Sequence, residues 1–117
     1  FAGSPVAAAV GNAVLDVIEE VGILHHVHET GAHLGKGLRE IEERCDVVSD
    51  VRGKGLFWGI ELGSAEAARA AREGLRRAGV LLGVTGPGAN VLKVRPPLVF
   101  AKTHADRLLE ALENVLK

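Results

Sequence analysis

The spacing of the hydrophobic residues first changes near residue 46, and this change constrains the fold most. Before it, apolar residues recur every three or four positions, which is typical of helices. In residues 56–62, apolar side chains fall on every second position, which predicts a strand with one buried face. A chain that begins with two helices and then turns to strands lacks the strict alternation of strands and helices that a parallel sheet needs.

Helix start and stop signals divide the first part of the chain into two helices. Ser4 can cap a helix whose first position is Pro5, and Gly22 supplies a stop signal. These signals predict a helix over residues 5–21. A second apolar stripe over residues 24–45, with charged residues between its members, predicts a longer helix.

Four strands and two further helices are expected after residue 46. Thr103 is expected to cap the last helix, with Asp106 as its capping-box partner. We therefore expect an α+β fold, in which helices pack on one face of a small, largely antiparallel sheet. The expected strands are residues 47–52, 56–62, 80–84 and 91–95, and the expected helices are residues 65–78 and 103–116.

Composition and charge exclude several classes of protein. Hydrophobic residues make up 47% and charged residues 25%, the balance of a globular protein. The formal net charge is -1, so the chain lacks the basic excess typical of nucleic-acid or membrane-surface proteins. No apolar run approaches the ~20 residues of a membrane helix. The single cysteine cannot form an internal disulfide, which favours a cytoplasmic location.

The histidines and the cysteine do not form a recognisable metal or nucleophile motif. His25, His26, His28 and His33 lie close together, but no His-Glu-x-x-His motif or cysteine pair accompanies them. We expect a hydrated helix flank there and no metal site. Cys45 falls on the apolar stripe of the second helix, which favours an inert buried thiol.

Lys93 and Arg95 are the candidate ligand-binding residues. Alternation along the strand directs Leu92 and Val94 into the core and places Lys93 and Arg95 together on the opposite face. Two cations beside a rigid Pro-Pro pair can hold an anionic group. An ordinary solvated face would show the same pattern, so the residues alone leave both interpretations open.

Three separate segments resemble those of class III aminotransferases, which are pyridoxal-phosphate enzymes of fold type I. Residues 48–62 are similar to the family segment DVRGxGLxxGIEL, residues 1–5 to TFGGNP, and residues 90–98 to NVLRxxPPLV. The segments occur in the family's order, and the resemblance covers nearly the whole chain. Lys93 stands where many members have the arginine that grips the substrate carboxylate. In this respect the chain resembles the alanine–glyoxylate type-two and phospho-lyase branch.

The resemblance implies a fragment that lacks the large domain. Residues 1–22 would be the connecting helix from that missing domain, and residues 23–117 the C-terminal small domain. The lysine that holds pyridoxal 5'-phosphate would lie upstream, so we expect no catalytic residue in this chain and no activity from the fragment alone. Gly3 and Ser4 would lie near the cofactor phosphate of the partner subunit in a homodimer.

The resemblance also implies a reaction class. The parent enzyme would move an amino group between an amine or amino acid and a 2-oxo acid, with Lys93 and Arg95 contacting the substrate. A phospho-lyase on the same scaffold is one alternative. A non-catalytic α+β interaction module is another.

Overall fold

The computed structural model describes residues 2–117, which form four helices and four strands. Phe1, the first residue of the Phe-Ala-Gly-Ser-Pro segment, lies outside the described residues. The elements in chain order are α1 (Pro5–Glu20), α2 (Ile23–Arg44), β1 (Val48–Lys54), β2 (Phe57–Leu62), α3 (Ala65–Arg77), β3 (Gly83–Thr85), β4 (Val91–Val94) and α4 (Lys102–Leu116).

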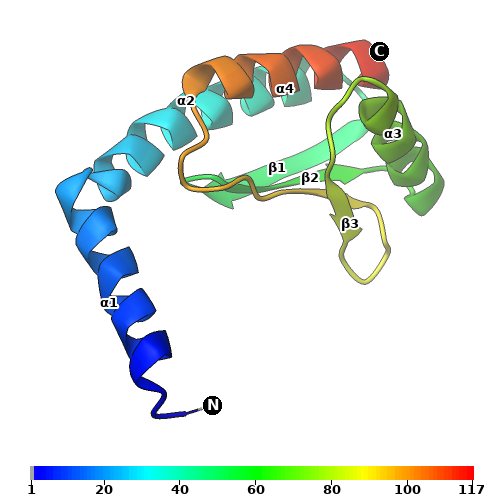
Figure 1. Ribbon diagram of the computed structural model, residues 1–117. Coiled ribbons are helices and arrows are strands. Elements are labelled where there is room, and N and C mark those ends of the chain that lie inside the picture. Colours follow the sequence, from blue (N-terminus) through cyan, green and yellow to red (C-terminus); the bar gives the residue numbers. More distant parts are fainter. Residues whose placement is uncertain (1) are drawn as a thin grey trace.

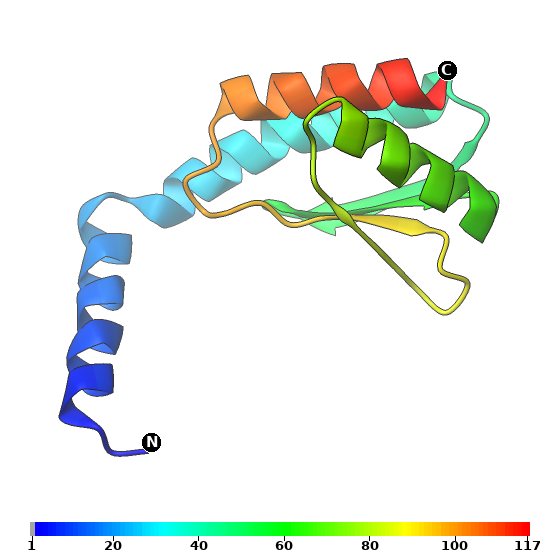
Figure 2. The same cartoon turned by 45° about the vertical axis from the view of Figure 1, so that its right-hand side comes forward.

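The four strands form one sheet in the order β1-β2-β4-β3, and each neighbouring pair is antiparallel. Helices α2, α3 and α4 cover one face, which we call the inner face (Figures 1 and 2). This arrangement confirms the expected α+β fold. The outer face carries no helix from the described residues. Inner-face side chains include Val51, Trp58, Ile60, Leu92 and Val94, and outer-face positions include Arg52, Phe57, Gly59, Glu61 and Lys93.

The core lies between the inner face and the three helices. Close packing of α2 on the β1–β2 hairpin depends on glycine, because a Cβ at Gly31 would collide with the backbone carbonyl of Gly55. The core therefore requires small residues as well as apolar ones. Its largest fully buried apolar side chains are Leu34, Leu38 and Ile41 of α2, Ile60 and Leu62 of β2, Leu75 of α3, Leu92 of β4 and Leu112 of α4.

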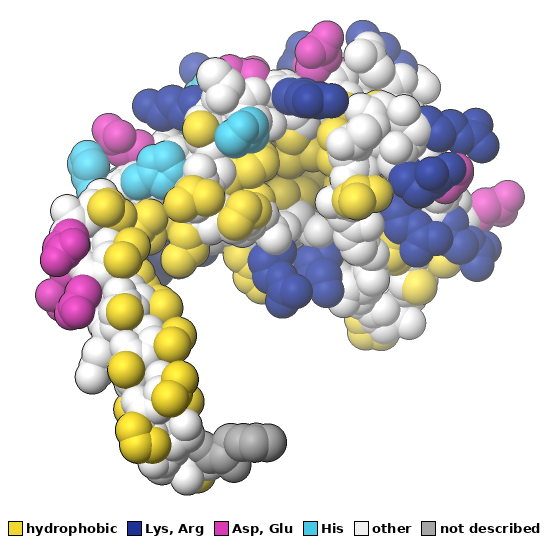
Figure 3. Space-filling model, viewed as in Figure 1, with side chains coloured by type: hydrophobic (Ala, Val, Ile, Leu, Met, Phe, Trp, Pro, Cys, Tyr) yellow, Lys and Arg dark blue, Asp and Glu magenta, His cyan; other side chains and the backbone are white. Residues whose placement is uncertain are grey.

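Helix α1 extends away from this core and contains no buried residue (Figures 1 and 2). Its predicted caps are confirmed: the Ser4 hydroxyl accepts the Ala7 N–H at 3.4 Å, and Gly22 adopts a left-handed φ of 62°. The helix exposes a row of valines, including Val6 and Val10 (Figure 3). No helix in residues 2–117 is both long and apolar enough to cross a membrane.

Two predicted local features are wrong. The third strand begins only at Gly83, because the N–H of Val80 bonds to the carbonyl of Leu75 and closes the end of α3 (2.8 Å). Thr103 does not cap α4, because the helix already begins at Lys102. Instead, the Nδ1 of His104 accepts the N–H of Ala101 at 3.1 Å, which closes the first turn of α4.

Candidate functional site

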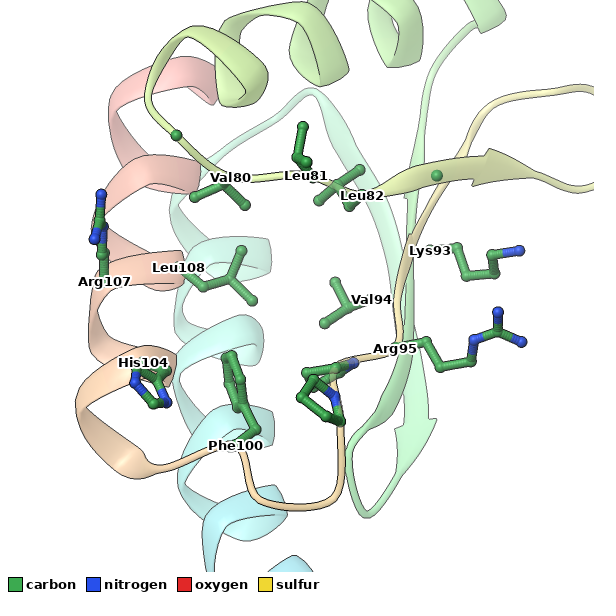
Figure 4. A pocket seen from close by; sticks show the side chains of 14 residues that line it. Val80, Leu81, Leu82, Lys93, Val94, Arg95, Phe100, His104, Arg107 and Leu108 are labelled. Atoms are coloured by element: carbon green, nitrogen blue, oxygen red, sulfur yellow. The ribbon is translucent and has the colours of Figure 1, made fainter.

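The predicted alternation along β4 is confirmed. Leu92 is fully buried and Val94 is 4% exposed, both on the inner face. Lys93 is half-buried and Arg95, just after the strand, is exposed. Figure 4 shows the side chains of Lys93 and Arg95 extending to the same side, away from Val94. The structure therefore brings the two predicted cationic residues together on one face.

Glycines flank Lys93 on both neighbouring strands. Lys93 lies opposite Gly59 of β2 and opposite Gly83 of β3. Its side chain runs over Gly83, because a Cβ there would lie 3.4 Å from the lysine Cε and 3.9 Å from Nζ. Packing over a glycine, rather than an ion pair, accounts for the half-buried position of Lys93.

The cations of the outer face differ in their partners. The Arg52 guanidinium contacts Asp50 and bonds to the Glu61 carboxylate, with Nη1 and Oε2 2.7 Å apart. Hydrogen bonds to Asp50 and then to Glu61 raise the pKa of Arg52 above its usual value. Within residues 2–117, neither Lys93 nor Arg95 forms an ion pair. Lys93 and Arg95, like Lys54 of β1 and Arg107 of α4, are therefore cations that can bind an external anion.

A pocket of about 610 Å³ lies between the end of β4, the segment before β3 and the start of α4. Apolar side chains line its interior (Figure 4), and they form part of the hydrophobic hollow in Figure 3. Lys93 and Arg95 border it at β4, and His104 and Arg107 border it at α4. None of the described residues that line it is acidic. The apolar side chains are Val80, Leu81, Leu82, Val94, Phe100 and Leu108, together with Pro96 and Pro97.

A second, smaller pocket of about 370 Å³ adjoins the first. It lies between the start of α2 and the β1–β2 turn, where Phe57 is 58% exposed. Arg95 and Pro96 line both pockets, so they form the ridge between them. Arg95 can therefore contact a group bound on either side.

Gly3 and Ser4 precede α1, at the end of this helix that lies away from the sheet (Figure 1). The φ of Gly3 is 83°, and nothing lies within 4 Å of the place where its Cβ would be. Pro5 has no N–H, the Ser4 hydroxyl accepts the N–H of Ala7, and the Ser4 carbonyl accepts the N–H of Ala8, so the first turn of α1 is capped within the chain.

Two histidines connect α2 to the C-terminal part of the chain, which the sequence pattern did not predict. The Nε2 of His33 lies 2.6 Å from Oδ1 of Asp106, and the Nε2 of His26 lies 2.9 Å from the carbonyl of Phe100. In residues 2–117, no group of three or more His, Cys, Asp or Glu side chains could hold a metal ion. Cys45 is half-buried at the end of α2. Polar contacts of α2 with α4 and with the segment before α4 therefore occupy part of the predicted hydrated flank.

Sequence comparison identifies relatives of the whole chain. The family model described as "Aminotransferase class-III" matches residues 1–116. The chain is 34% identical over 125 residues to ethanolamine-phosphate phospho-lyase homolog 1 of Caenorhabditis elegans, covering 99% of this chain and 27% of the relative. It is also 34% identical over 121 residues to mitochondrial alanine–glyoxylate aminotransferase 2 homolog 2 of Arabidopsis thaliana, covering 97% and 25%. The chain thus spans about a quarter of the length of these relatives.

Solved structures share the fold. An Arthrobacter phospholyase in complex with phosphoethanolamine superposes with a TM-score of 0.92 at 39% identity, covering 96% of this chain and 28% of that one. An amine transaminase from an uncultivated Pseudomonas species, in its pyridoxal-phosphate-bound form, gives 0.85 at 32% identity, covering 96% and 27%. The predicted resemblance is thereby confirmed. The chain belongs to the class III aminotransferase family and corresponds to the C-terminal portion of its members.

Proposed function

We propose that this chain is the small-domain part of a pyridoxal-phosphate-dependent aminotransferase. In this proposal residues 1–22 connect it to a large domain, and residues 23–117 form the small domain. The complete enzyme moves an amino group from an amine or amino acid to a 2-oxo acid. The family match supports this proposal, as do transaminase relatives and a relative with bound pyridoxal phosphate.

The observation that carries the proposal is that Lys93 and Arg95 lie on one side of the sheet and form no ion pair within residues 2–117. Amino acids and 2-oxo acids bear a carboxylate, and a charge-assisted hydrogen bond from Lys93 would hold it. Pyridoxal phosphate, when bound, supplies an electron sink for the carbon that carries the amino group. The residues of this chain then bind and orient the substrate, and the cofactor lysine belongs to the rest of the polypeptide.

A phospho-lyase is the second candidate, and Lys93 favours it. A lysine ammonium is a compact point charge, whereas an arginine fork matches a planar carboxylate. A lysine at this position can therefore bind either a phosphate or a carboxylate. The likeness to a phospho-lyase homolog and to a phospholyase bound to phosphoethanolamine supports a phosphorylated amino alcohol as substrate.

Gly3 and Ser4 serve the cofactor in this proposal. They would approach the phosphate of pyridoxal phosphate in the partner subunit of a homodimer, in the cytoplasm. The exposure of Gly3 and the empty space beside it support this role. The start of α1 lies away from the sheet in Figure 1, which is compatible with two subunits sharing each site.

The test is a reaction assay on the full-length protein with added pyridoxal phosphate. Amino acids, neutral amines and phosphoethanolamine are each supplied with and without a 2-oxo acid. Formation of a new amino acid only when the 2-oxo acid is present supports the aminotransferase. Release of phosphate from phosphoethanolamine in the absence of a 2-oxo acid supports the phospho-lyase. Absence of turnover on every donor contradicts both and favours a non-catalytic module. The 117-residue chain alone is the matched control and is expected to be inactive.

A further inference from the structure

We propose that Arg52 is a positioning residue, which keeps Lys93 available to anionic substrates by holding the carboxylate of Glu61. The proposal rests on the anion-binding role of Lys93 proposed above. If the Glu61 carboxylate had no other partner, it could form an ion pair with Lys93 and neutralise the charge that binds the substrate.

The strand register places Arg52 and Lys93 on either side of one glycine. Arg52 of β1 lies opposite Gly59 of β2, and Gly59 lies opposite Lys93 of β4. Glu61 lies two residues further along β2 on the same face. Diagonal neighbours of this kind in an antiparallel sheet are about 7–8 Å apart, within reach of two long side chains. Glu61 can therefore pair with a cation on either flanking strand.

In the structure Glu61 pairs with Arg52 and not with Lys93. Its Oε2 lies 2.7 Å from the arginine Nη1, and the same nitrogen also contacts Asp50. The Lys93 side chain extends in the other direction, over Gly83 of β3. The two outer-face carboxylates of the described strands, Asp50 and Glu61, are thus both held on the β1 side.

Loss of the guanidinium would change this distribution. Asp50 lies opposite Glu61 in the register, so two like charges would face each other without a cation between them. Repulsion from Asp50 would then favour movement of Glu61 toward Lys93. An exposed ion pair formed there would compete with the substrate anion by about two- to fivefold.

Steady-state kinetics of the full-length protein at low ionic strength test the proposal. The donors are one with a carboxylate or phosphate and one neutral amine. We expect Arg52→Gln to lower kcat/KM for the anionic donor about two- to fivefold, through KM, and to leave the neutral donor unchanged. High salt should shrink the loss. Arg52→Gln combined with Glu61→Gln should restore wild-type kinetics, because the competing carboxylate is gone.

Two further variants keep the test decisive. Arg52→Lys retains a cation beside Glu61 and is expected to match the wild type. Glu61→Gln alone removes the competitor and is expected to cause no loss for the anionic donor. An equal loss on both donors, a loss that Glu61→Gln does not rescue, or no effect of Arg52→Gln would overturn the proposal.

Lys93→Ala separates this proposal from the proposed function. If Lys93→Ala lowers kcat/KM for the anionic donor and Arg52→Gln does not, the proposed role of Arg52 is wrong and the anion site stands. If Lys93→Ala changes nothing, the anion site itself is wrong, and the role of Arg52 falls with it.

Discussion

The two faces of the sheet differ in what covers them. On the inner face Ile60 and Leu92 are fully buried beneath α2, α3 and α4. On the outer face Phe57 is 58% exposed, and Lys93 carries a charge without a partner in the described residues. One strand, β4, contributes to both faces through alternate residues. Substitutions at neighbouring residues of β4 should therefore have different effects. A change on the inner face should lower the stability of the protein, and a change on the outer face should weaken substrate binding.

Truncation of the inner face should have the largest effect on stability. Leu92→Ala removes a fully buried side chain and leaves a cavity between β4 and the helices. We expect a loss of about 2–5 kcal/mol in the free energy of unfolding. Urea denaturation of the 117-residue chain measures it. Lys93→Ala on the same strand is the matched control, with an expected change within about 0.5 kcal/mol. Equal losses for the two variants would break the comparison.

Two glycines of the sheet should sharpen the comparison with a smaller effect. At Gly53, opposite Trp58 on the inner face, a Cβ would lie 2.5 Å from the indole Cδ2. Gly53→Ala should therefore cost about 1–3 kcal/mol through overpacking. At Gly83 a Cβ would make only ordinary contact with Lys93, 3.4 Å from its Cε. We expect Gly83→Ala to be close to neutral.

Thermal unfolding of the two alanine variants side by side gives the measurement. A lower melting temperature for Gly53→Ala alone supports the distinction between the faces. The same decrease in both variants would show that the outer face is packed as tightly as the inner face.

The local pattern was sufficient to predict which face each residue of β2 and β4 occupies. Alternation depends only on neighbouring residues, so the buried positions of Trp58 and Ile60 and the shared side of Lys93 and Arg95 could be predicted. The start of β3 could not be predicted, because the N–H of Val80 bonds to the carbonyl of Leu75 in the turn that follows α3.

The contacts that distinguish one cation from another depend on register and packing. Arg52 reaches Glu61 only because β1 pairs with β2 in one alignment, which shifts between Val48 and Asp50. The contact of His33 with Asp106 joins residues 73 positions apart. Neither contact leaves a periodic signal in the sequence. The resemblance to a family could therefore predict Lys93 as a substrate-binding residue, but not that it forms no ion pair within residues 2–117.

The central claim is that Lys93 binds an anionic group of the substrate. Its most direct test is kcat/KM of the full-length protein and of its Lys93→Ala and Lys93→Arg variants, on anionic and neutral donors. Loss of a charge-assisted hydrogen bond, worth about 1.5–3 kcal/mol, predicts a decrease of about ten- to a hundredfold for Lys93→Ala on anionic donors. The neutral donor should change little, and Lys93→Arg should be tolerated. Equal kinetics of all three proteins on every donor would contradict the claim.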